Sequence, residues 1–198
     1  MKSGFAADWM SQFYATLSDD RAIGDRLRDA SLASNLAEWT SALTSVVVRA
    51  FDGLGMPTAA KGHACTVLPL KQQEYLGQDV MAFPPEETGW RFPVAVCELE
   101  NAASDERVAY SLWKVLCVRC QLRLVFCYRP EPSAGVPLVV WLGRSVVGAL
   151  PISARTALEG DTIVIVGSRD EADTFPNGFF LVWKLNTNTG RFERLPRA

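Results

Sequence analysis

The sequence predicts an α/β fold in which helices flank a mixed central sheet. Three observations lead to this prediction. Apolar residues recur at helical spacing over residues 5–50, the pattern changes to that of strands after His63, and a helix-like segment at residues 104–117 separates the first strands from the next one. With 198 residues, 48% of them hydrophobic, the chain can bury one sizeable core, so we expect a single domain over residues 1–198.

The composition is typical of a globular protein of the cytoplasm. The apolar runs are interrupted by Arg, Gly or Pro before they reach the length of a membrane span, and the amino terminus lacks the apolar core of a signal peptide. Five cysteines, an odd number, favour reduced thiols. The net charge of −2 gives no general attraction to nucleic acid, so such binding would need a local basic surface.

Residues 5–50 are predicted to form two or three helices. Breaks or caps are expected at residues 18–20 and at Ser31, and two glycines and a proline within residues 53–57 end the last helix. Glu38 lies in the first turns of that helix. Its carboxylate is interpreted as a solvated charge that suits the helix dipole, and alternatively as a metal ligand.

The next part of the chain is predicted to hold three strands, at residues 64–68, 75–83 and 92–101. Residues 84–89 are predicted to form the turn before the third strand. Asp79 lies within the second strand among apolar residues, where a lone carboxylate needs a partner. Side chains alternate between the faces of a strand, so Glu98 and Glu100 of the third strand point the same way. A three-strand meander would bring Asp79 next to them, and such a group of acids is costly to bury unless a divalent cation compensates.

Residues 104–117 are predicted to form a helix that Ser104 caps. Arg107, Tyr110 and Lys114 share one side of this helix because they are spaced i, i+3 and i+7. A helix packed over the third strand would aim Lys114 toward the carboxylates. The alternative is a solvated Arg/Lys face with a half-buried tyrosine.

The rest of the chain is predicted to contain a strand, a helix, a buried strand and a β-hairpin, at residues 122–128, 136–150, 161–168 and 179–195. Three arginines near the end form either a local basic surface or the solvated tip of the hairpin: Arg191, Arg194 and Arg197.

Two features argue against other kinds of site. Cys117 and Cys120 form a lone Cys-x-x-Cys at a helix end, which we interpret as buried structural cysteine rather than a zinc or redox site, because a second ligand pair is missing. His63 is the only histidine, which excludes most catalytic triads.

The order helix, three strands, helix, strand (αβββαβ), with Asp79 on the second strand and Glu98-Leu99-Glu100 at the end of the third, resembles the PD-(D/E)XK nuclease superfamily. The resemblance covers about residues 31–128 and implies the restriction-endonuclease-like fold of that family. It leaves an N-terminal helical region before this core. It also leaves a C-terminal extension, residues 136–198, that ends in the β-hairpin.

The resemblance implies a metal-dependent nuclease. Asp79 and Glu98 match the acids that bind Mg²⁺ or Mn²⁺, and the Leu99 carbonyl would be a further ligand. Glu100 occupies the position of the motif's lysine, and Lys114 matches the lysine that some members carry on the following helix. The residue before Asp79 is Gln78 where the family has proline.

The implied reaction is metal-assisted hydrolysis of phosphodiester bonds, with DNA as the expected partner and Glu100 or Lys114 orienting the attacking water. Whether the protein forms a homodimer stays open. Three other functions also stay open: an inactive nuclease fold that binds nucleic acid, a protein-interaction domain that uses aromatics such as Trp90 or Trp183, and a glycosidase with two carboxylates. The last ranks lowest, because acids on one strand lie closer together than the acid and nucleophile that flank a sugar.

Overall fold

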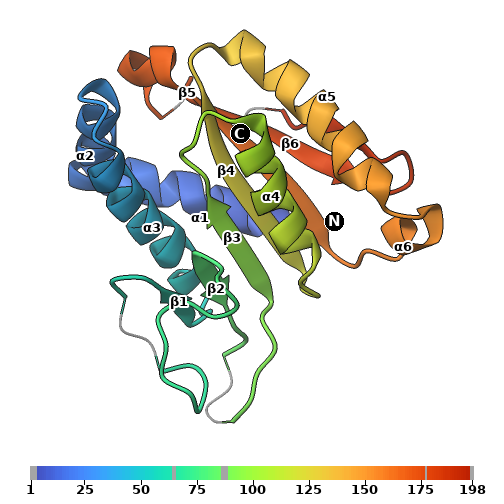
Figure 1. Ribbon diagram of the computed structural model, residues 1–198. Helices are drawn as coiled ribbons and strands as arrows, with labels where there is room; N and C mark the ends of the chain where they lie inside the picture. Colours follow the sequence, from blue (N-terminus) through green and yellow to red (C-terminus); the bar gives the residue numbers. More distant parts are fainter. Residues whose placement is uncertain (1–3, 64–65, 86–88, 177, 197–198) are drawn as a thin grey trace. The chain divides into compact units, whose positions relative to one another are not determined.

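The computed structural model describes residues 4–63, 66–85, 89–176 and 178–196 (Figure 1). The fold is α/β, with seven strands of mixed direction, which confirms the predicted fold class at this level. The chain divides into two compact units, Met1–Cys97 and Glu98–Ala198, called here the first and second unit. Among the described residues, no helix combines the length and apolar character that crossing a bilayer requires.

The first unit opens with three helices, α1 (Phe5–Asp19), α2 (Arg21–Leu32) and α3 (Leu36–Asp52). The side chain of Asp20 accepts a hydrogen bond from the Ile23 N–H and caps α2, and Asn35 caps α3 through the Glu38 N–H. Ser31, expected at a break, is instead buried inside α2. The predicted helical region, the cap within residues 18–20 and the helix end near Gly53 are therefore confirmed, whereas Asn35 rather than Ser31 marks the start of α3.

The strands of the first unit are β1 (Thr58–Ala60), β2 (Val80–Ala82) and the first three residues of β3 (Ala95–Leu99). β1 pairs antiparallel with β2, and β2 pairs antiparallel with β3, in the register Val80 to Cys97. The antiparallel order of three consecutive strands is as predicted, but the first strand is a different segment from the predicted one and the bounds of the other two are corrected. Phe92 at the predicted start of the third strand is exposed and lies outside β3.

The first two predicted strands differ from the observed ones. Leu76 and Gly77 both have positive φ, at 54° and 63°, which is incompatible with strand geometry, so only Val80–Ala82 of the predicted segment 75–83 is extended. Residues 66–68 form no strand, while 64 and 65 lie outside the described residues, as do 86–88 of the predicted turn. The first strand lies instead at Thr58–Ala60, ahead of His63.

The second unit contains the strands β4 (Leu122–Arg129), β5 (Asp161–Ser168), β6 (Phe180–Asn186) and β7 (Arg191–Arg194). β4 and β5 are parallel, while β5–β6 and β6–β7 are antiparallel, so this unit alone forms a mixed sheet. The predicted strands and the hairpin are confirmed. Every residue of β4 is buried, and only Asp161 of β5 is not, as a parallel pair covered on both faces requires.

Helices α4 (Asp105–Leu116), α5 (Gly135–Ser145) and α6 (Ile152–Thr156) complete the second unit. α4 packs against β4, and α5 lies beside α4 and contacts β7 (Figure 1). Ser104 caps α4 as predicted, because its hydroxyl accepts a hydrogen bond from the Arg107 N–H at 3.4 Å. The predicted helix at 136–150 is observed as α5 followed by a short 3₁₀ turn.

Two details hold the start of the parallel pair in place. Arg123 is almost fully buried, and its guanidinium donates to the carbonyls of Val118 at 3.0 Å and Glu159 at 2.8 Å. Gly160 has a φ of +73°, and a Cβ there would collide with the backbone of Gln121. Only glycine therefore allows β5 to begin with the hydrogen bond from Asp161 N–H to Gln121 O, at 2.8 Å.

Candidate functional site

Glu98 and Lys114 form a largely buried ion pair in the second unit. Lys114 Nζ lies 2.8 Å from Glu98 Oε1, and the two side chains are 19% and 6% exposed. Glu98 belongs to β3, and Lys114 comes from the last turn of α4. The expected approach of Lys114 to the strand-end acids is therefore observed. Because a buried carboxylate is costly without a cation, this pairing accounts for how Glu98 is accommodated.

Glu100 lies one residue beyond the end of β3 and stabilises the turn into α4. Its Oε1 accepts a hydrogen bond from the Ala102 N–H at 2.8 Å, and its Oε2 accepts one from Ser111 Oγ at 3.5 Å. Arg107 Nε lies 3.7 Å from the same Oε2. The side chain that stands at the motif's lysine position thus makes structural hydrogen bonds, and each of the two acids has a cationic neighbour from α4.

Two aromatic rings lie next to this ion pair on α4. Lys114 Nζ is 6.0 Å from the centre of the Tyr110 ring, within the range of a cation–π contact. The Tyr110 ring in turn stacks on Trp113, with centres 5.9 Å apart and planes 19° from parallel. Tyr110 and Trp113 are 54% and 55% exposed. The sequence pattern predicted a shared face for Arg107, Tyr110 and Lys114, but Trp113 was not recognised as part of it.

Asp79 and Glu38 belong to the first unit. Asp79 is a half-buried bend residue directly before β2, not a residue within that strand as expected. Because it lies in a different unit from Glu98, the expected convergence of the two acids stays a prediction. Glu38 lies in the first turn of α3 and forms an ion pair with Arg26. This environment agrees with a solvated helix charge, and the metal role of Glu38 also stays a prediction.

The donor chemistry of Glu98 suits Mg²⁺ or Mn²⁺. Within the described residues, no three His, Cys, Asp or Glu side chains assemble into a metal-binding group. Mg²⁺ is commonly held by only one or two carboxylates together with water and substrate phosphates. A carboxylate at the end of a buried strand, with the Leu99 carbonyl next to it in the chain, is compatible with that mode.

The described cysteines are free thiols that differ in exposure. No disulfide links the four described cysteines, Cys97, Cys117, Cys120 and Cys127. Burial raises the pKa of the Cys127 thiol to about 12, which makes it a poor nucleophile. Cys117 is exposed, which corrects the expectation of a buried Cys-x-x-Cys, whereas Cys120 is buried as expected. Cys65 lies outside the described residues.

The Ser45 hydroxyl lies next to His63, but its hydrogen bonding is not that of an activated nucleophile. His63 Nε2 lies 3.4 Å from Ser45 Oγ, and that hydroxyl donates to the Ser41 carbonyl at 3.0 Å. Since the hydroxyl proton is directed to Ser41, the imidazole can only act as the donor to Ser45. A general base needs the opposite arrangement.

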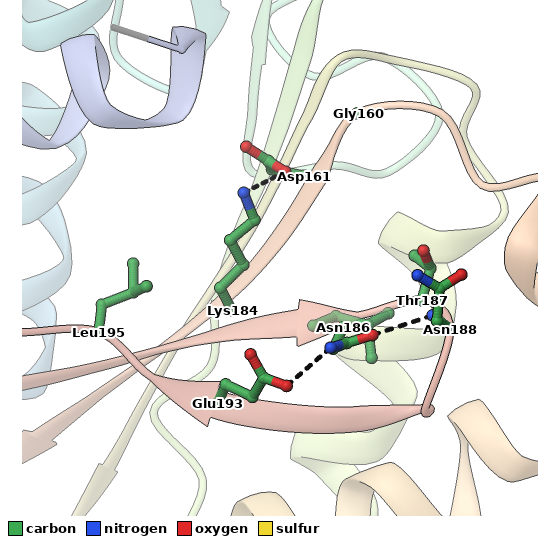
Figure 2. A pocket seen from close by; sticks show the side chains of 9 residues that line it. Gly160, Asp161, Lys184, Asn186, Thr187, Asn188, Glu193 and Leu195 are labelled. Carbon is green, nitrogen blue, oxygen red and sulfur yellow. Dashed lines mark hydrogen bonds and ion pairs between the residues drawn. The ribbon is translucent and has the colours of Figure 1, made fainter. Parts of the chain in front are cut away.

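The second unit also has a polar pocket of about 300 Å³ at the ends of β5, β6 and β7 (Figure 2). Lys184 Nζ lies 2.7 Å from Asp161 Oδ1, and Asn186 Nδ2 donates to Glu193 Oε1 at 2.7 Å. The charged and polar groups of the pocket therefore pair with one another between neighbouring strands. Sequence reasoning missed this pocket because the strand register alone brings residues 161, 184 and 193 together.

The predicted C-terminal features have mixed outcomes. Arg191 and Arg194 are exposed on β7, while Arg197 lies outside the described residues. Of the aromatics proposed for protein contacts, Trp90 is exposed and Trp183 is buried. Trp183 packs close to Gly135, where a Cβ would come within 2.9 Å of its ring.

A scan against protein-family models found no match for this chain, and comparisons with curated proteins and with solved structures found none either.

Proposed function

We propose that this protein is a metal-dependent nuclease that hydrolyses phosphodiester bonds in DNA, with a restriction-endonuclease-like core. The observation that supports this proposal most directly is the ion pair between Lys114 and Glu98. It brings the acid at the end of the third strand into contact with a lysine from the following helix. The element order from α3 to β4 agrees with the αβββαβ core.

In this proposal Glu98 and the Leu99 carbonyl would hold Mg²⁺ or Mn²⁺, while the role of Asp79 of the first unit as a second ligand stays a prediction from the sequence. The ion would supply charge neutralisation at the scissile phosphate and a lowered pKa of a water molecule. Lys114, which lies beside Glu98, would orient the attacking water through a hydrogen bond from its ammonium group.

Glu100 has a positioning role in the proposal. Its carboxylate holds Ala102 N–H and Ser111 Oγ, and so fixes the turn that joins β3 to α4. Glu98 and Lys114 lie on either side of this turn. Loss of Glu100 would therefore loosen the Glu98–Lys114 geometry instead of removing a group that contacts the substrate.

The experiment is cleavage of supercoiled plasmid and of single-stranded DNA by purified protein in Mg²⁺, Mn²⁺ or EDTA. Glu98→Gln and Lys114→Ala are each expected to lower the rate by about two orders of magnitude or more, because each removes a charged group from the proposed site. Asp79→Asn tests the predicted role of Asp79 in the same assay. Lys184→Ala is the matched control, since it breaks a lysine–aspartate pair of the second unit to which the proposal gives no role. Absence of cleavage in either metal, or cleavage that survives both Glu98→Gln and Lys114→Ala, would refute the proposal.

A second candidate is a nuclease fold without catalysis that binds nucleic acid. The observation that favours it is the neutralisation of both acids by α4, Glu98 by Lys114 and Glu100 by Arg107. Such pairing maintains the fold without a metal. DNA binding by a protein that cleaves nothing in either metal would support this candidate.

A further inference from the structure

We infer that Tyr110 and Trp113 form a stacking platform for unpaired bases of single-stranded DNA beside the Glu98–Lys114 pair. The inference rests on the proposed function for the identity of the polymer, and on the geometry of α4 for the contact itself. It extends the proposed function by stating that the DNA is held as a single strand through its bases.

The two rings stack on each other at the surface of α4. Tyr110 and Trp113 are spaced i, i+3, so they lie next to each other on one side of α4. Their rings are nearly parallel and stacked, and more than half of each residue is accessible to solvent. A stacked pair on a rigid helix needs no rearrangement to receive a further flat ring. Every nucleobase has such a flat π face.

The platform is joined to the proposed site by a single side chain. Lys114 contacts the Tyr110 ring through its ammonium group and contacts Glu98 through the same Nζ. Because Trp113 and Lys114 already contact the Tyr110 ring, a further base would stack at the Trp113 end of the pair, on the same helix as the lysine that contacts Glu98.

The charges around the rings favour a polyanion over an apolar protein partner. Arg107 precedes Tyr110 by one turn and is 66% exposed in its side chain, and Lys114 follows Tyr110 by one turn. Glu106 is the nearest exposed acid on the same helix. Lys114 is held by Glu98, so Arg107 is the exposed cation that can meet a phosphate beside the rings. An exposed cation next to exposed rings is the combination that single-strand binding proteins use, with cations for the phosphates and rings for the bases.

The Tyr128 ring also has a cation above it, but it is not accessible to a ligand. Arg169 lies 5.1 Å from the centre of the Tyr128 ring, but Tyr128 is buried. Trp90 of the first unit is more exposed than either ring of α4, and it therefore serves as the control for mere exposure of an indole.

The test measures binding in EDTA, so that its result does not depend on cleavage. Fluorescently labelled single-stranded DNA of about 20 nucleotides, longer than one binding site, is compared with a strand of equal length that carries abasic sites. We expect Tyr110→Ala/Trp113→Ala to weaken binding of the intact strand by about tenfold or more, since each stacked base contributes about 1–3 kcal/mol. The variant should bind the abasic strand as the wild type does. Trp90→Ala should change neither, and Tyr110→Phe/Trp113→Phe, which keeps both rings, should restore most of the affinity.

Three outcomes would overturn the inference. The first is equal binding of the intact strand by wild type and the alanine variant, and the second is no binding of either strand. The third is a change in oligomeric state of the alanine variant by light scattering with unchanged DNA affinity, which would assign the rings to contact with a second copy. A plasmid assay of the wild type in Mg²⁺ tests the nuclease separately, so cleavage by the wild type together with unchanged single-strand binding by the alanine variant would refute the platform alone. Circular dichroism melting of each variant establishes that it is folded.

Discussion

The Glu98–Lys114 pair allows a quantitative test of how the candidate site is built. Lys114→Met keeps the length and apolar stem of the lysine and removes its charge, which leaves the Glu98 carboxylate buried without its cation. Breaking a buried pair in this way costs about 3–5 kcal/mol. Because the lysine side chain is 19% exposed, we expect a loss at or below the lower end of this range, roughly 2–3 kcal/mol in the free energy of unfolding.

The opposite change should be milder. Glu98→Gln leaves an ammonium group that can turn toward water along its flexible stem, so about 1 kcal/mol is expected. The double variant removes both charges and should lose less than the sum of the single losses, with a coupling energy of at least about 1 kcal/mol. Lys184→Met is the control, because the Lys184–Asp161 pair is 41% and 28% exposed and should be worth no more than about 1 kcal/mol.

Thermal unfolding measures these differences. For a chain of this size, roughly 2–3 kcal/mol corresponds to a fall of about 4–12 °C in Tm. Circular dichroism and tryptophan fluorescence should be followed together, because coincident curves are needed before a single free energy is assigned to a protein of two compact units. A Lys114→Met protein as stable as the wild type, or additive single losses, would refute the buried-pair reasoning.

Three further predictions concern the metal, the thiols and the parallel strand pair. Millimolar Mg²⁺ should raise the Tm of the wild type and not that of Glu98→Gln, as differential scanning fluorimetry would show; an equal shift in both would place the ion elsewhere. Burial raises the pKa of the Cys127 thiol to about 12 against an ordinary value of 9.0, so the unfolded chain loses this proton first. Stability should therefore fall between pH 9.0 and about 12 by up to about 1.4 kcal/mol per pH unit, and urea titrations should show a shallower fall for Cys127→Ala. Gly160→Ala should destabilise the protein by several kcal/mol, because the new Cβ meets the Gln121 backbone where β5 starts; an unchanged urea midpoint would contradict this.

Much of the fold could be predicted because its signals are local. The start of α4 follows from a serine at the N-cap, and the β6–β7 hairpin follows from the polar Asn186–Thr189 segment between the apolar run 179–185 and residues 190–195. The strand predicted at 75–83 failed because Leu76 adopts a left-handed conformation that nothing in its residue type indicates. In such cases the tertiary environment overrides a pattern that is compatible with a strand.

The candidate site was predictable to the extent that helical geometry determines it. The seven-residue spacing from Arg107 to Lys114 predicted that both cations share a side of α4, and each is found beside an acid. The role of Glu100 was not predictable, because its hydrogen bonds to Ala102 and Ser111 depend on the shape of the turn after β3. The stacking of Trp113 depends on rotamers, which a spacing pattern does not specify.

Because of Arg123, guanidinium chloride and urea should affect the stability of this protein differently once that arginine is replaced. Its side chain ends in a guanidinium ion held by the carbonyls of Val118 and Glu159, and guanidinium chloride supplies that same ion in solution. In an Arg123→Ala chain, the vacated space with its two carbonyl acceptors matches the denaturant cation. Low concentrations of guanidinium would then bind the native state and stabilise it by mass action, before higher concentrations unfold it. Urea carries no charge and offers no such replacement, so unfolding curves in the two reagents would rank this variant differently against the wild type.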